Sequence, residues 1–217
     1  MKETDFIKSH DVYAASYDDQ VKEFHSYGHD VLFGMCFEYI KPGETLLDLG
    51  IGTGLSSIHF SRMGLDITGL DGSEEMLKMC RKKSFAKELK QYDIRDIPLP
   101  YPDRSFSNII CCGVFHFFGD ILPIIKDAHR ILKPDGLLAF SIAIPSSVEL
   151  KPGSNPQPDY IKLPTAWGVS IFKHTDQYIK TITDSLNFTV LKEQKILTDS
   201  GDPNSEDIPF KVIILRK

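Results

Sequence analysis

The segment Leu46–Gly54, with the sequence LLDLGIGTG, restricts the fold of this chain more than any other. It begins as an apolar run typical of a buried parallel strand, and Asp48 interrupts that run shortly before three glycines alternate over five positions. Glycines at this spacing let the backbone turn tightly and let a ligand approach the main chain where a Cβ atom would block it. A carboxylate at the end of the strand repels a phosphate, so the segment favours a ligand that carries positive charge.

Composition and charge exclude several broad classes of protein. The chain has 217 residues, 41% hydrophobic and 25% charged, which fits one soluble globular domain. Its net charge of −5 gives no general electrostatic reason to bind nucleic acid or an anionic membrane. The start of the chain lacks the apolar core of a signal peptide, and no apolar run is long enough to cross a bilayer. We therefore expect a cytoplasmic monomer or homodimer that has neither nucleic acid nor a membrane as a partner.

The cysteines give no sign of a metal or redox site. They are Cys36, Cys80, Cys111 and Cys112. The adjacent pair would point to opposite faces of a strand, so it forms neither a CxxC redox pair nor half of a zinc site. We expect small buried apolar residues here and no bound metal.

Alternating strand and helix patterns predict an α/β fold. A helical stretch over residues 4–40 precedes the glycine segment, and Gly28 is expected to interrupt it. Strands are predicted near 45–49, 65–70, 88–92, 106–112 and 137–144, with helices near 54–63, 73–83 and 121–132. Strands that alternate with helices imply a parallel sheet with helices on both faces.

The last third of the chain differs from the rest. Residues 145–165 hold five prolines, which favours an ordered loop or lid. A helix near 176–186 and strands near 188–196 and 210–215 complete the chain. These last strands are expected to add an antiparallel edge to the sheet.

Polar residues and glycines occur where successive predicted strands end. The glycine segment follows the first strand, Asp71 the second, Asp93 the third and Cys112-Gly113 the fourth. Since the carboxyl ends of parallel strands lie along one edge of a sheet, these residues should converge on one ligand site.

The nearest competing motif is the dinucleotide-binding fingerprint G-x-G-x-x-G, with an acid about 20 residues further on. Gly50 and Gly52 match it, and Asp71 lies at a suitable distance. Leu55 stands where the third glycine should be, whereas the glycine comes one position early, at Gly54. Asp48 and Asp93 also have no role in that fingerprint, so the pattern favours another ligand.

Several motifs together resemble those of class I S-adenosylmethionine-dependent methyltransferases of the small-molecule, ubiquinone-biosynthesis-like type. The resemblance is carried in order by 46–57, 69–77, 92–98, 105–110 and 129–136, with a Tyr13…Tyr17-Asp18 pattern like the family's helical cap. Ser107 stands where the family usually has an acid, and Asp135 where it commonly has glycine. The segment after Pro145 matches only loosely.

This resemblance implies a fold and a division of the chain. The fold is Rossmann-like, with a seven-stranded, mostly parallel sheet covered by helices on both faces, an antiparallel C-terminal edge strand and an N-terminal helical cap. One methyltransferase domain would cover 1–217, with the cap at 1–42, the cofactor-binding core at 43–144, and a substrate-side loop and sheet edge at 145–217.

The resemblance also implies S-adenosylmethionine as the cofactor and S-adenosylhomocysteine as its product. Asp71 would accept hydrogen bonds from the ribose hydroxyls, Asp93 from the adenine amine, and Asp48 would order the loop or a water beneath the methionine moiety. The implied cofactor residues are Tyr17, Asp48, Gly50, Gly52, Gly54, Asp71, Gly72, Ser73, Met76, Asp93, Ile94 and Cys112. Simpler interpretations stay open, since Asp71-Gly72 suits a plain turn and Ser73 a helix cap.

The methyl acceptor is predicted only by elimination, as a small molecule. His116 and His174 are candidates for a general base, although a structural histidine is the simpler interpretation of each. Tyr13, His116 and Trp167 are candidates to line the acceptor site. Two other functions stay open: a non-catalytic partner protein that binds the cofactor or its product, and a nicotinamide-dinucleotide-dependent oxidoreductase.

Overall fold

A computed structural model describes residues 6–146, 149–150, 159–165, 168–198 and 207–217 of the chain. The strands are β1 (Thr45–Leu49), β2 (Asp66–Asp71), β3 (Glu88–Gln91), β4 (Phe106–Cys111), β5 (Leu132–Ala143), β6 (Tyr160–Pro164), β7 (Ser170–His174), β8 (Thr189–Thr198) and β9 (Ile208–Arg216). The helices are α1 (Phe6–Tyr13), α2 (Tyr17–Glu23), α3 (Gly28–Cys36), α4 (Ser57–Arg62), α5 (Glu74–Lys82), α6 (Leu122–Ile131) and α7 (Asp176–Ser185). Short 3-10 turns occupy Ala14–Ser16 and Phe115–Phe117. No helix in these described ranges has the length and apolar character needed to cross a membrane.

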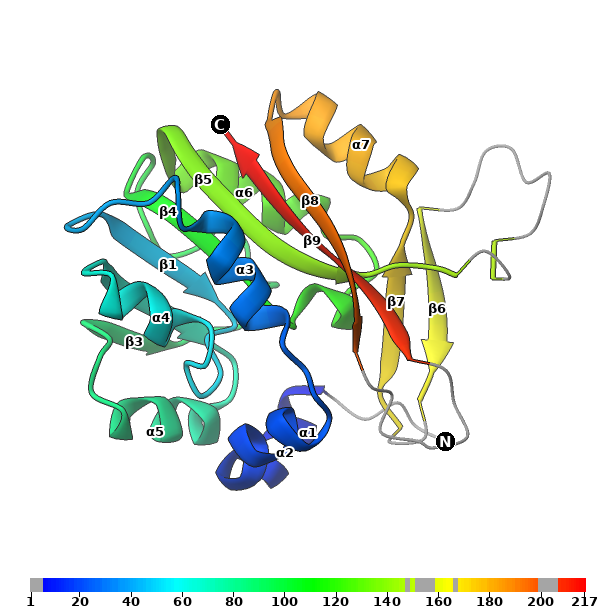
Figure 1. The fold of residues 1–217 in the computed structure, drawn as a ribbon, viewed down its shortest axis with the longest axis horizontal. Helices are drawn as coiled ribbons and strands as arrows, with labels where there is room; N and C mark the ends of the chain where they lie inside the picture. The colour runs from blue at the N-terminus through cyan, green and yellow to red at the C-terminus, as the bar shows by residue number, and fades with distance from the viewer. Residues whose placement is uncertain (1–5, 147–148, 151–158, 166–167, 199–206) are drawn as a thin grey trace.

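The predicted parallel sheet is confirmed. Its strands follow the order β3-β2-β1-β4-β5, and every neighbouring pair in this run is parallel. β9 pairs antiparallel with β5, and β8 pairs antiparallel with β9 at the edge (Figure 1). The antiparallel C-terminal edge predicted from the sequence is therefore also confirmed.

Side chains of the central strands alternate between two apolar layers, one on each face of the sheet. Leu47 and Leu49 of β1 belong to a core that also takes in buried residues of α6 and α7. Leu46, which points the other way, belongs to a second core with buried residues of α3, α4 and α5. This period-two pattern in a continuous apolar run is what a parallel strand covered on both faces requires.

The predicted number of strands is wrong, since the sheet has nine strands and not seven. The two additional strands are β6 and β7, an antiparallel hairpin that meets β5 through the single parallel pair Ala143–Lys173. β6 lies at the end of the segment predicted to be a loop or lid. Its half-buried Ile161 and Leu163 alternate with three exposed residues, and the prolines and lysine around them obscure this pattern in the sequence.

Candidate cofactor site

The first two helices of the N-terminal cap, α1 and α2, lie at the bottom of the view in Figure 1, and α1 contacts α5; the third, α3, covers the sheet. Ile7 packs on the backbone of Gly72. A Cβ atom added to Gly72 would lie 2.6 Å from Ile7 Cδ1. Ser73 Oγ donates a hydrogen bond to Asp11 Oδ1 over 2.5 Å, so α1 is fixed to the start of α5. The cap is therefore held directly against the residues that follow β2.

A second polar contact joins the cap to the glycine segment. Thr53 Oγ1 donates to Asp18 Oδ1 over 2.5 Å, and Lys83 Nζ pairs with the other oxygen of Asp18 at 2.6 Å. Thr53 is buried, which shields its hydrogen bond from water. Asp18 thus connects α2, the glycine segment and the end of α5.

The glycines of this segment have different roles. Gly52 has a φ of +55°, and nothing lies within 4 Å of the position that a Cβ atom would occupy, so its backbone faces open space. At Gly54, with a φ of +87°, a Cβ atom would come within 2.5 Å of the Phe85 ring and 2.9 Å of Cys80 Sγ. Gly54 is therefore required for packing, whereas Gly52 leaves room for a ligand.

Asp48 lies beneath the glycine segment and does not reach the cleft. It is 1% exposed, and it accepts a hydrogen bond from Ser57 Oγ over 2.6 Å. Burial raises the pKa of this carboxyl and the hydrogen bond lowers it, and the resulting pKa is about 7. Asp48 therefore ties β1 to the first turn of α4, and its role in ordering the loop or a water beneath the methionine moiety stays a prediction.

Asp71 connects the ends of two strands. Its Oδ2 accepts from the backbone N–H of Gly52 over 2.7 Å, and its Oδ1 accepts from that of Ser73 over 2.8 Å. Burial raises the pKa of this carboxyl, while the two backbone hydrogen bonds lower it. Each carboxylate oxygen has a further lone pair, so Asp71 can still accept hydrogen bonds from a ligand.

Asp93, which follows β3, forms an ion pair with Arg95. The guanidinium contacts both carboxylate oxygens at 2.5–2.9 Å. Burial acts to raise the pKa of Asp93, but the contacts with Arg95 outweigh it and lower the pKa overall. The Arg95 guanidinium also lies 5.1 Å from the centroid of the Phe6 ring, so the cap covers this strand end as well.

One cleft of about 980 Å³ runs along the carboxyl ends of β1, β2, β3 and β4. It is lined by ten of the twelve residues predicted to bind the cofactor: Tyr17, Gly50, Gly52, Asp71, Gly72, Ser73, Met76, Asp93, Ile94 and Cys112. Asp48 and Gly54 do not line the cleft. Asp48 lies beneath the glycine segment, and Gly54 packs against Phe85 and Cys80. The convergence predicted from the four strand ends is thus present in the structure.

The structure places the residues predicted for the acceptor side in different positions. Tyr13 and His116 line the cleft, whereas His174 does not, and Trp167 lies outside the described residues. His174 is fully buried, with its Nε2 at 3.0 Å from the carbonyl oxygen of Gly119 and its ring stacked on Tyr178. The structure therefore contradicts a role for His174 as a base in this cleft and supports the structural alternative.

His116 remains beside the cleft as a neutral imidazole. Burial, together with nearby His10 and His174, lowers the pKa of its ring to about 3. Its ring packs against Phe117 and Phe210, and its buried Nδ1 has no hydrogen-bond partner among the described residues. A base with so low a pKa accepts a proton weakly at neutral pH, so His116 is better suited to hydrogen bonding.

The far end of the cleft was not predicted from the sequence. It is lined by Leu163 of β6, Ile171 of β7, Ile196 of β8 and Phe210 of β9. The late strands that carry these residues reach the parallel sheet in two ways: β8 and β9 through the antiparallel pairing of β9 with β5, and the β6–β7 hairpin through the pair Ala143–Lys173. The strands that carry Ile196 and Phe210 were predicted from the sequence, whereas the β6–β7 hairpin that carries Leu163 and Ile171 was not.

A parallel sheet that presents a glycine turn and two acids to one cleft defines a Rossmann-like cofactor-binding protein. Residues 47–140 match the family described as "Methyltransferase domain". Demethylmenaquinone methyltransferase of Tropheryma whipplei (strain Twist) is 34% identical over 99 residues, covering 46% of this chain and 41% of that protein. The chain thus spans less than half the length of this relative.

Solved structures share the fold. A SAM-dependent methyltransferase of Methanosarcina mazei superposes with a TM-score of 0.66 at 18% identity, covering 84% of this chain and 96% of that one. The 1,6-didemethyltoxoflavin-N1-methyltransferase of Burkholderia thailandensis, solved with bound 1,6-didemethyltoxoflavin and S-adenosylhomocysteine, superposes with a TM-score of 0.66 at 15% identity, covering 94% of this chain and 88% of that one. Residues 47–140 are therefore similar to the methyltransferase domain family, and solved structures of methyltransferases share the fold of this chain.

Proposed function

We propose that this protein transfers a methyl group from S-adenosylmethionine to a small-molecule acceptor. The observation that carries the proposal is the cleft at the strand ends, into which β1, β2, β3 and β4 each bring a residue predicted from the sequence to hold the cofactor. The open backbone at Gly52 fits the methionine end of the cofactor, and Asp71 fits its ribose. Asp93 fits the adenine amine if Arg95 shifts to share that carboxylate.

The cofactor supplies a methyl group already activated by a sulfonium, so the chain needs chiefly to align the acceptor and exclude water. The cap would close the cleft over the cofactor through the contacts of Asp11 and Asp18. The neutral ring of His116 would orient the acceptor by a hydrogen bond. No residue of the cleft is assigned as a general base.

The acceptor end of the cleft favours an apolar or aromatic small molecule. Leu163, Ile171, Ile196 and Phe210 line it with apolar side chains, and Lys173, which also lines the cleft, is paired with Glu149 at 2.9 Å. The cleft volume lies at the upper end of the roughly 300–1,000 Å³ usual for small-molecule sites, which leaves room for a cofactor and a small acceptor together. The cytoplasmic location and the monomeric or homodimeric state stay predictions.

Isothermal titration calorimetry tests the cofactor assignment. We expect S-adenosylmethionine and S-adenosylhomocysteine to bind with micromolar dissociation constants and NADH not to bind. Tight binding of NADH without binding of either sulfur compound would overturn the proposal. Turnover of labelled S-adenosylmethionine with a panel of aromatic acceptors then separates an enzyme from a non-catalytic cofactor-binding protein.

The contact between cap and glycine segment gives a second expectation. Asp18→Ala removes the hydrogen bond from Thr53 and the ion pair with Lys83, a loss of about 1 kcal/mol. Because the cap should order over bound cofactor, we expect the dissociation constant for S-adenosylhomocysteine to rise several-fold. Asp19→Ala is the matched control, since Asp19 is highly exposed and pairs only loosely with Lys22 at 3.5 Å. Equal affinities of the two variants would show that the cap does not contribute to binding.

A further inference from the structure

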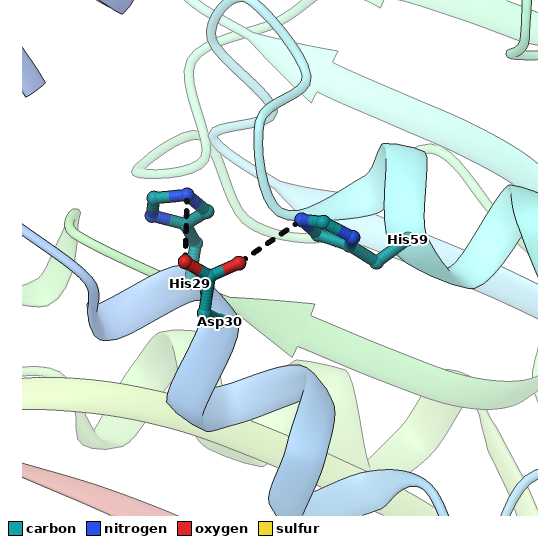
Figure 2. Close-up of side chains that lie close together, drawn as sticks. All are labelled: His29, Asp30 and His59. Carbon is teal, nitrogen blue, oxygen red and sulfur yellow. Dashed lines mark ion pairs between the residues drawn. The ribbon is translucent and has the colours of Figure 1, made fainter. Parts of the chain in front are cut away.

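Three potential metal ligands meet outside the residues assigned to the cofactor. His29 and Asp30 lie in the first turn of α3, and His59 lies in α4. Figure 2 shows the carboxylate of Asp30 between the two imidazole rings. One ligand atom from each residue lies within 4.8 Å of the others, and no other group of three His, Cys, Asp or Glu side chains in the described ranges does so. The cluster was not predicted from the sequence, because His59 lies 29 positions after Asp30 and meets it only where α3 packs against α4.

The distances within the cluster are not those of a satisfied hydrogen-bond network. Asp30 Oδ1 lies 3.2 Å from His59 Nε2, but Asp30 Oδ2 lies 3.7 Å from His29 Nε2, too far for a hydrogen bond. Ligand atoms about 2.0–2.2 Å from a tetrahedral Zn²⁺ are roughly 3.3 Å apart. Small side-chain movements would therefore bring these three atoms to metal-binding distances.

The surroundings hold the two imidazole rings in place. The backbone of Ser26 hydrogen-bonds with the ring of His29, a type of contact that orients histidines bound to metals. The His59 ring lies 5.4 Å from that of Phe33, and the two imidazoles lie 6.2 Å apart at an interplanar angle of 24°. The side chains of His29 and His59 are 16% and 27% exposed, so the site is shielded but open to an ion from solution.

We propose that His29, Asp30 and His59 bind a divalent transition metal, with Zn²⁺ the best match to two imidazoles and one carboxylate. Three protein ligands leave a fourth position for water or for an oxygen of a ligand. His29 also lines the cleft, so that position would lie at the border of the cofactor site. The metal would tie α3 to α4, the helix that follows the glycine segment. This site does not depend on the methyl-transfer activity proposed above.

Titration of Zn²⁺ alone into tag-free, chelator-treated full-length protein tests the proposal. We expect one ion per chain with a dissociation constant in the micromolar range or tighter, and a visible absorption band when Co²⁺ replaces Zn²⁺. Asp30→Asn is the decisive variant, because Asp30 is half-exposed and its replacement leaves the packing intact. We expect it to weaken Zn²⁺ binding at least tenfold and to reduce the Co²⁺ band.

Matched variants separate this site from other histidines. His59→Ala should give the same loss, while His25→Asn, at an exposed residue of the preceding turn, should bind like the unchanged protein. Absence of stoichiometric Zn²⁺ binding, or binding that Asp30→Asn leaves unchanged, would overturn the proposal. Binding of S-adenosylhomocysteine, measured on the same samples, reports independently on the cofactor site.

Discussion

Replacing Asp71 with alanine is expected to weaken the binding of S-adenosylmethionine by at least tenfold. A hydrogen bond to a charged group contributes about 1.5–3 kcal/mol, and a ribose offers two hydroxyl donors to this carboxylate. The variant also frees the backbone N–H groups of Gly52 and Ser73, which Asp71 holds at 2.7 and 2.8 Å. The expected loss therefore includes both the direct contact and the order of the cleft wall. Calorimetry with S-adenosylmethionine and S-adenosylhomocysteine measures it.

Two further variants make this result interpretable. Asp71→Asn keeps one oxygen acceptor for the backbone and should fall between alanine and the unchanged protein. Asp66→Ala removes an acid from the other end of the same strand, where Asp66 pairs with Lys87 at the surface, and should leave affinity unchanged. A Kd for Asp71→Ala equal to that of Asp66→Ala would refute the assigned role of Asp71.

The sequence predicted the core of the site because that core depends on local signals. Each strand end is marked by residues next to it in the chain, and the parallel order of the strands brings Asp71 and Asp93 to one edge. Glycine spacing and an N-cap at Ser73, whose Oγ accepts from the Met76 N–H, are likewise local. Patterns of this kind are visible without knowing how distant segments pack.

The parts that could not be predicted depend on packing between distant segments. His174 ends β7 and precedes α7, like a residue of an active site, but the docking of β7 turns it towards Gly119 and Tyr178. The cluster at His29 arises only where α3 meets α4. The apolar end of the cleft needs β8 and β9 in register beside β5. None of these three arrangements can be predicted from the spacing of residues in the sequence.

The buried carboxyl of Asp48 leads to the second large effect, a change in how stability depends on pH. Its pKa is about 7 in the folded protein and about 3.8 for an unshifted aspartate. Well below pH 3.8 the group is protonated in both states and has no influence. Between pH 4 and 7 it ionises in the unfolded chain while it stays protonated in the folded one, so the folded state loses stability as pH rises. Three pKa units correspond to about 4 kcal/mol.

Asp48→Asn should abolish this contribution, because asparagine does not ionise in either state and its amide oxygen can still accept the hydrogen bond from Ser57. We expect the free energy of unfolding of the variant, relative to the unchanged protein, to increase by up to about 4 kcal/mol from pH 4 to pH 7 and to level off above pH 7. For a chain of this size that is roughly 2–4 °C in Tm per kcal/mol. Asp19→Asn, at an exposed side chain, should keep the original pH dependence. A difference between Asp48→Asn and the unchanged protein that stays constant from pH 4 to 8 would mean that Asp48 is ionised in the folded state, and that its contact with Ser57 outweighs its burial.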